Sequence, residues 1–157
     1  MKLKFLVMAF LLLGVATTQA RYDEVVGSVT HVIDGDTFDV HVNAGNNGFL
    51  DSRVVPDSII RIRPADINCP ETRGSKKCAA GFAATNYTRS WLLGKTVYLD
   101  LDNKTGKDQY GRWVAMVYLP VNGTMRNFNK MLITSGHAVM DDFNNNEFEP
   151  AIWMKEP

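Results

Sequence analysis

The chain lacks a surplus of either charge, because 17 basic residues balance 17 acidic ones. A chain without a broad basic field cannot draw in a polyanion from a distance, so any anion must be bound by local arginines or a cation. Cysteine is also scarce, with only Cys69 and Cys78. A single C-x8-C pair offers no second pair of ligands, which argues against a structural zinc site. Internal repeats are missing too, which excludes repeat architectures.

The one long apolar run lies at the N-terminus. Two lysines precede the apolar stretch 5–15, and a small-x-small pattern ends at Ala20, directly before Arg21. This arrangement predicts a signal peptide at 1–20, cleaved between Ala20 and Arg21. The run is too short to cross a bilayer comfortably and no second one follows it. We therefore expect a secreted or periplasmic protein with no membrane anchor after cleavage.

The mature chain, 21–157, has a length that suits one compact domain, and we expect a monomer. Without the two N-terminal lysines it has 15 basic against 17 acidic residues, a formal charge of about −2. An oxidising compartment makes a disulfide between Cys69 and Cys78 the simplest interpretation, with two free thiols as the alternative. Three N-x-[ST] sequons would matter only in a source that glycosylates; they lie at Asn86, Asn103 and Asn122.

The apolar pattern predicts mostly strands. Residues 22–42 read as a hairpin whose bend carries Asp34-Gly35-Asp36, and a long loop over 43–56 leads into a strand at 59–63. Two further strands are predicted at 96–101 and 113–119. Several short strands without a βαβ rhythm favour a mostly β protein with helices, a five-stranded β-barrel of the OB type packed with two to three helices.

The predicted helices cover 77–92 and 125–135, each ended by a glycine. An acidic, Asn-rich tail begins at Asp141, and we expect its aromatic residues to keep it ordered. The buried stripe of the first helix is expected to comprise Ala79, Ala80, Phe82, Ala83, Tyr87 and Trp91.

Three short motifs follow one another along the chain. They are Asp34-Gly35-Asp36-Thr37, then Arg63 followed by Asn68-Cys69-Pro70-Glu71, then Tyr110-Gly111-Arg112. Phosphodiester hydrolysis needs a cation held by oxygens, a base for water, and fixed positive charge near the phosphate, and together these motifs supply all three. Each piece alone has a simpler interpretation: acids that cap a tight turn, or surface ion pairs.

These motifs, with Ile33 before the first and Gly136-His137-Ala138 after the last, resemble the staphylococcal nuclease family. The resemblance implies an OB barrel with helices, Ca²⁺ as cofactor, and cleavage of DNA and RNA that leaves 3′-phosphate ends. It also implies roles for single residues. By position, the metal ligands are Asp36, Asn68 and the backbone carbonyl of Cys69, the general base is Glu71, and the arginines on the scissile phosphate are Arg63 and Arg112.

The chain departs from the family pattern at Asn68, which brings an amide oxygen where the family has a carboxylate. Asp66, two residues earlier, is a further candidate ligand, because side chains two apart share a face of an extended segment; the alternative is a solvated Asp66. Asp34 is expected beside the ligands. Tyr110 and Phe143 are candidate substrate contacts, although the acids at 141–142 would repel phosphate. The alternative function is a secreted OB-fold nucleic-acid-binding module that has lost catalysis.

Overall fold

The structure is a computed structural model, and it describes residues 24–43 and 51–156. The predicted signal peptide, its cleavage site and part of the predicted loop at 43–56 lie outside the described residues. No helix among the described residues is long and apolar enough to cross a membrane.

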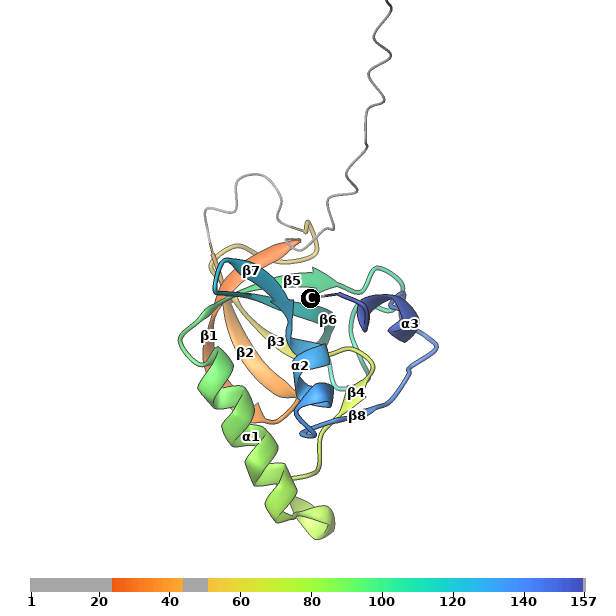
Figure 1. Cartoon of the computed structure of the whole chain (residues 1–157). Helices are drawn as coiled ribbons and strands as arrows, with labels where there is room; N and C mark the ends of the chain where they lie inside the picture. The colour runs from red at the N-terminus through yellow and green to blue at the C-terminus, as the bar shows by residue number, and fades with distance from the viewer. Residues whose placement is uncertain (1–23, 44–50, 157) are drawn as a thin grey trace, which may run out of the picture.

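Five strands close into a barrel, which confirms the predicted OB-type fold (Figure 1). In chain order these strands are β1 (Val25–Asp34), β2 (Thr37–Val42), β3 (Ile59–Pro64), β5 (Thr96–Leu101) and β6 (Trp113–Val121). Strands β3, β2, β1, β5 and β6 pair in that order, and each pair of neighbours is antiparallel. Parallel pairing of β3 with β6 closes the barrel.

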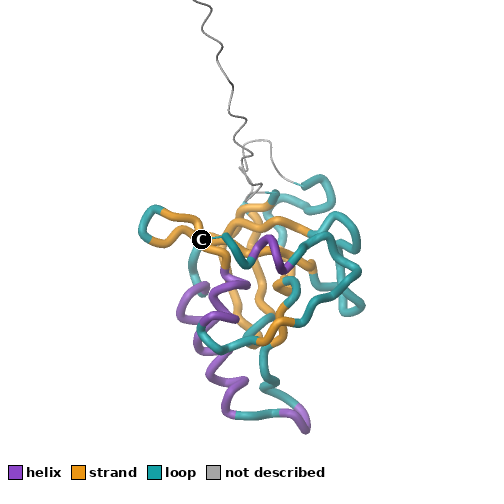
Figure 2. Tube along the Cα trace, turned by 45° about the vertical axis from the view of Figure 1, so that its right-hand side comes forward, coloured by secondary structure: helices purple, strands orange, loops and turns teal. Residues whose placement is uncertain are grey.

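Alternating side chains of these strands fill the barrel. Phe38, Ile62, Leu99 and Met116 come from four different strands and are all at most 1% exposed. Burying a side chain of this size stabilises the fold by about 1.5–3 kcal/mol each. Figure 2 shows the strands at the centre, with the longest helix along one side and loops gathered on the other.

The long helix α1 (Ala79–Leu92) packs on β1, but the predicted buried stripe is wrong. The predicted residues are exposed or half-buried, and small or polar residues face the barrel instead. The reason is close approach: a Cβ added at Gly81 would lie 2.2 Å from the carbonyl oxygen of Glu71. Gly94, with φ +73°, lies just beyond the helix end, as expected. The buried residues of α1 are Gly81, Ala84, Thr85, Thr88 and Leu92.

The second predicted helix is shorter than expected. Residues 122–123 both have positive φ and turn β6 into a further strand, β7 (Thr124–Asn127). The Asn127 side chain then accepts a hydrogen bond from the backbone N–H of Lys130 and begins helix α2 (Phe128–Thr134). A capping residue and a two-residue hairpin turn therefore override the helical pattern at 125–127.

Short elements bring the C-terminal segment, residues 139–153, beside the second motif (Figure 1). Strand β4 (Ile67–Asn68) pairs with β8 (Val139–Met140), and the chain then continues to helix α3 (Pro150–Trp153). Trp153 is 3% exposed, so the tail docks on the barrel as expected. A 3-10 turn, η1 (Gly74–Lys76), precedes α1.

Candidate active site

The first motif forms the tight turn between β1 and β2. Asp34 Oδ1 accepts a hydrogen bond from the backbone N–H of Asp36 at 3.2 Å. The turn is pressed against α1 and the second motif, because a Cβ at Gly35 would lie 2.8 Å from side-chain atoms of both Ala84 and Cys69. Thr88 donates its hydroxyl to the Gly35 carbonyl at 2.6 Å. Only glycine fits at this turn, which fixes where both carboxylates lie.

The Asp36 carboxylate joins the first motif to the second. Its Oδ2 accepts a hydrogen bond from the backbone N–H of Cys69 at 2.7 Å, and Nη2 of Arg63 lies 3.7 Å from the same oxygen. Arg63 is 7% exposed and also donates to the Pro64 carbonyl. The Phe143 ring covers it, with the ring centre 5.7 Å from Cζ of Arg63. Arg63 is thus held in a fixed position beside the acidic turn.

Arg112 is aimed by two side chains. Asp108 Oδ2 accepts from Nε of Arg112 at 2.7 Å, and the hydroxyl of Thr37 accepts from Nη1 at 2.8 Å. Tyr110 lies 5.3 Å from Cζ of Arg112 and is 74% exposed. The backbone reaches this geometry through Gly111, at φ +78°. Neither Thr37 nor Asp108 was predicted from sequence to orient Arg112, although the four-residue spacing from Asp108 to Arg112 is typical of an ion pair.

Glu71 presents its carboxylate from a loop whose backbone is tightly held. Its carbonyl oxygen accepts from the backbone N–H of Cys78, at 3.1 Å, and Gly81 lies against it. The side chain is exposed, and among the described residues its carboxylate has no hydrogen bond or ion pair. Glu71 is therefore not held in a surface ion pair, which was the simpler interpretation, and the carboxylate is free to reach water.

These groups surround a cavity of about 230 Å³. Every predicted catalytic residue and every candidate ligand except Asp66 lines it. A larger cavity of about 410 Å³ adjoins it and shares Arg63, Tyr110 and Arg112. The lining of the smaller cavity is Asp34, Asp36, Arg63, Asn68, Cys69, Pro70, Glu71, Tyr110 and Arg112.

The cavity concentrates negative charge at the turn. Burial, and then the neighbouring Asp36 carboxylate, raise the pKa of Asp34 above its ordinary value, while hydrogen bonds from Thr37 and Asp36 oppose the rise. Burial also raises the pKa of the Cys69 thiol, and the Asp36 charge adds to this effect. Cys69 therefore stays a neutral thiol at physiological pH.

The donor set fits a hard divalent cation. Among the described residues, no group of three His, Cys, Asp or Glu side chains converges on a metal position. Two carboxylates, the exposed amide of Asn68 and backbone carbonyls are nevertheless all oxygen donors, the kind that Ca²⁺ prefers. A cation here would relieve the repulsion between Asp34 and Asp36.

Two expectations need correction. The disulfide is not formed: Cys69 and Cys78 are both free thiols, because Cys69 is buried against Gly35 while Cys78 is exposed and its Sγ lies 3.9 Å from the Glu71 carbonyl. Asp66 does not lie beside Asn68 in the cavity. Its φ of 54° is left-handed, so the alternation of an extended strand does not apply there.

Comparison with known proteins agrees with this geometry. Residues 61–155 match the family described as staphylococcal nuclease homologue. An "Uncharacterized endonuclease" of Escherichia coli is 31% identical over 130 residues, which cover 82% of this chain and 70% of the relative. "Endonuclease Htp3" of Saprolegnia parasitica is 31% identical over 115 residues, covering 71% of this chain and 54% of the relative. The chain therefore belongs to the staphylococcal nuclease family.

Proposed function

We propose that this chain is a secreted or periplasmic, Ca²⁺-dependent nuclease that hydrolyses phosphodiester bonds of DNA and RNA and leaves 3′-phosphate ends. The observation that carries the proposal is the convergence of three motifs on one cavity, which Glu71, Arg63 and Arg112 line together with the acidic turn. The endonuclease names of the relatives support nuclease activity in general.

The two arginines bind the scissile phosphate. Both guanidinium groups are already oriented, Arg63 by Asp36 and the Pro64 carbonyl, Arg112 by Asp108 and Thr37. Charge placed before the reaction stabilises the extra negative charge of the transition state without reorganisation. Arginine also stays protonated at any working pH and can bind two phosphate oxygens at once.

Glu71 is the general base. Its carboxylate takes a proton from a water molecule, the water oxygen attacks phosphorus, and the bond from phosphorus to the 5′ oxygen breaks. The 5′ oxygen leaves and takes a proton from solvent water, and the phosphate stays on the 3′ side. The rigid backbone at Glu71, held by Cys78 and Gly81, directs the side chain while its exposure keeps it solvated.

Asp36, Asn68 and the Cys69 carbonyl are the groups that would hold calcium, with Asp34 beside them. A cation bound there would polarise a phosphate oxygen and lower the pKa of nearby water, which would help a weak carboxylate base. Asn68 supplies an uncharged oxygen, so the site has one negative charge fewer than a site with a carboxylate there. We therefore expect weak calcium affinity.

The test is cleavage of single-stranded DNA, double-stranded DNA and RNA by the mature chain with Ca²⁺, with Mg²⁺ and with EDTA. Glu71→Gln and Arg112→Ala should each reduce the rate by about 10²- to 10³-fold. Arg61→Ala is the matched control, because Arg61 lies on the same strand as Arg63 but is exposed and paired with Asp39 at 2.8 Å. Its rate should stay within about twofold.

Two further assays address the products and the compartment. We expect the products to have a free 5′ hydroxyl, which accepts a label directly. We also expect a 3′ phosphate, which a phosphatase removes. N-terminal sequencing of the exported protein should begin at Arg21. Retained binding of single strands with no cleavage under any metal would instead favour the binding module.

A further inference from the structure

Asp66 is a buried carboxylate with no part in the proposed chemistry. It lies in the turn between β3 and β4, is 0% exposed, and does not line the smaller cavity. Its Oδ1 accepts hydrogen bonds from the side-chain amide of Asn146 at 2.5 Å and the backbone N–H of Phe143 at 3.2 Å. Its carbonyl oxygen accepts from the backbone N–H of Asp141 at 3.0 Å. One residue thus binds the C-terminal segment at three points.

The backbone at Asp66 is also unfavourable. Its φ of 54° is in the left-handed region, which glycine adopts far more readily than aspartate. Burying a carboxylate there adds a desolvation cost. Such a combination persists only where the surrounding structure imposes it, and it is frequent at ligand-binding sites.

The segment that Asp66 binds is a wall of the larger cavity. Phe143, Asn145 and Asn146 line it together with Arg63 and Arg112. The Phe143 ring, 39% exposed, lies over the Arg63 guanidinium. Moving the segment would therefore remove the cover of Arg63 and open the cavity on that side.

We propose that Asp66 is a positioning residue for the substrate: it docks the C-terminal segment through Asn146 so that Phe143 and the exposed Asn145 form the wall that binds the nucleotide beside the scissile phosphate. This inference rests on the proposed nuclease function. An aromatic face stacks on any base, and the Asn145 amide can bond a base edge, so this wall suits a single-stranded nucleotide. Asp66 acts through the segment and touches neither metal nor phosphate.

Docking affects substrate binding because an undocked segment must first be ordered. If the segment is docked only a tenth of the time, the apparent affinity falls about tenfold, while the chemical step in the bound complex is unchanged. The signature of a positioning role is thus a raised KM with an unaltered kcat.

The test compares Asp66→Gly with Asp66→Asn. Glycine suits the left-handed backbone but has no acceptor, so KM for a short single-stranded DNA should rise about tenfold with kcat within about twofold. Asparagine keeps an acceptor oxygen, so its KM should stay within about threefold of wild type. Asp57→Gly is the matched control, because Asp57 also has a positive φ, 62°, but is exposed and paired with His41.

A double-mutant cycle adds a structural test. Asn146→Ala should also raise KM. Combining it with Asp66→Gly should add little, because both substitutions break the same hydrogen bond between Asn146 and Asp66. Hydrogen exchange at the Phe143 amide should be faster in Asp66→Gly than in wild type. Equal KM values for wild type and Asp66→Gly, or a higher Ca²⁺ requirement without a KM change, would overturn the proposal.

Failure of the nuclease function is distinguishable from failure of this inference. A wild-type chain that cleaves nothing refutes the proposed function. In that case the affinity of wild type and Asp66→Gly for the same oligonucleotide, measured by fluorescence anisotropy, still decides the role of Asp66. Equal affinities would refute it, and weaker binding by Asp66→Gly would support it.

Discussion

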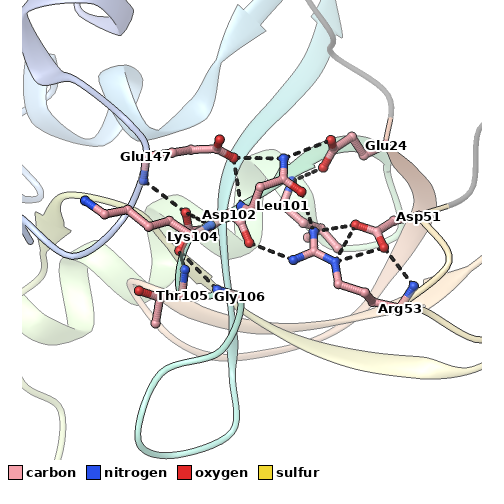
Figure 3. Close-up of polar contacts among 10 residues, drawn as sticks. Glu24, Asp51, Arg53, Leu101, Asp102, Lys104, Thr105, Gly106 and Glu147 are labelled. Atoms are coloured by element: carbon pink, nitrogen blue, oxygen red, sulfur yellow. Dashed lines mark hydrogen bonds and ion pairs between the residues drawn. The ribbon is translucent and has the colours of Figure 1, made fainter.

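Two fully buried carboxylates, Asp102 and Asp66, hold the C-terminal segment against the barrel, and their hydrogen bonding differs sharply. Asp102 follows β5 and accepts four backbone N–H groups, from Lys104, Thr105, Gly106 and Glu147 (Figure 3). Among the described residues, the Asp66 carboxylate accepts from the Asn146 amide and the Phe143 N–H, both at Oδ1. Its Oδ2 and the indole N–H of Trp153 make no hydrogen bond of standard geometry among the described residues.

The difference is in how far hydrogen bonds offset the burial of each carboxylate: fully for Asp102, and only in part for Asp66. Burial raises the pKa of Asp66, and the hydrogen bonds from Asn146 and Phe143, with the nearby indole of Trp153, oppose this only in part. Asp102 instead places both oxygens among amide donors, so its burial is compensated. Asp102 organises the loop that leads to Arg112, whereas Asp66 lies in the turn beside the cavity wall.

The largest expected effect is the loss of stability in Asp102→Ala. Four backbone N–H groups, one buried and three partly buried, would lose their acceptor, and we expect the free energy of unfolding to fall by about 3–5 kcal/mol. Urea denaturation followed by fluorescence measures it. Asp102→Asn, which keeps one acceptor oxygen, should lose about half as much. A loss below about 1 kcal/mol in Asp102→Ala would show that water replaces the carboxylate. Asp102 would then not differ from Asp66 in its contribution to stability.

The barrel could be predicted from sequence because strand alternation and turn residues are local signals. The bend at Asp34-Gly35-Asp36 and the strand at 96–101 lie where they were predicted. The buried face of α1 could not, because it depends on how closely the helix approaches the Glu71 backbone and the Gly35 turn. Phe82, although apolar, therefore remains exposed while Thr88 faces inward.

The members of the candidate site could be predicted, but their supports could not. The motifs named Arg63, Glu71 and Arg112, and the structure brings them to one cavity. Asp66 was misplaced because its φ is left-handed and its carboxylate bonds to a segment 77 to 80 residues away. Long-range partners of a buried carboxylate leave no local pattern in the chain.

A smaller effect on stability is expected at Asp66. Asp66→Ala should reduce the free energy of unfolding by about 1–3 kcal/mol, because the Asn146 amide and the Phe143 N–H lose their acceptor. Asp66→Gly should lose about 1 kcal/mol less, because glycine adopts positive φ without the strain of a side chain. Thermal and urea unfolding of both variants measure the difference. If glycine is no better than alanine, the backbone at Asp66 is not strained.

Hydrogen exchange in the wild-type chain should show which of the two carboxylates, Asp102 or Asp66, holds its N–H donors more firmly. The Thr105 N–H donates to Asp102 at 2.8 Å, whereas the Phe143 N–H donates to Asp66 at 3.2 Å. We expect the Thr105 amide to exchange about tenfold more slowly, because local opening near Asp66 breaks fewer bonds. Exchange rates by NMR would test the ranking, and the reverse order would mean that Asp66 is the firmer anchor.

The smallest effect concerns Asp51, which supports the Asp102 cluster from outside. Asp51 binds Arg53, whose Nη1 donates to the Asp102 carbonyl at 2.9 Å (Figure 3). The hydrogen bonds from Arg53 hold the pKa of Asp51 below its ordinary value of 3.8. This pair is near the surface, so Asp51→Asn should cost only about 0.2–1 kcal/mol at pH 7.

The pH dependence of that small difference follows from its sign. A carboxyl whose pKa is lower in the folded state stabilises the fold above its unfolded value of 3.8, and this stabilisation is lost as pH falls through the folded value. The gap in unfolding free energy between wild type and Asp51→Asn should therefore close below about pH 3.8. Urea titrations at pH 7, 4 and 3 measure the gap. A gap that persists at pH 3 would mean that Asp51 stabilises the fold through packing and shape. The negative charge of Asp51 would then not be needed to hold Arg53 against Asp102.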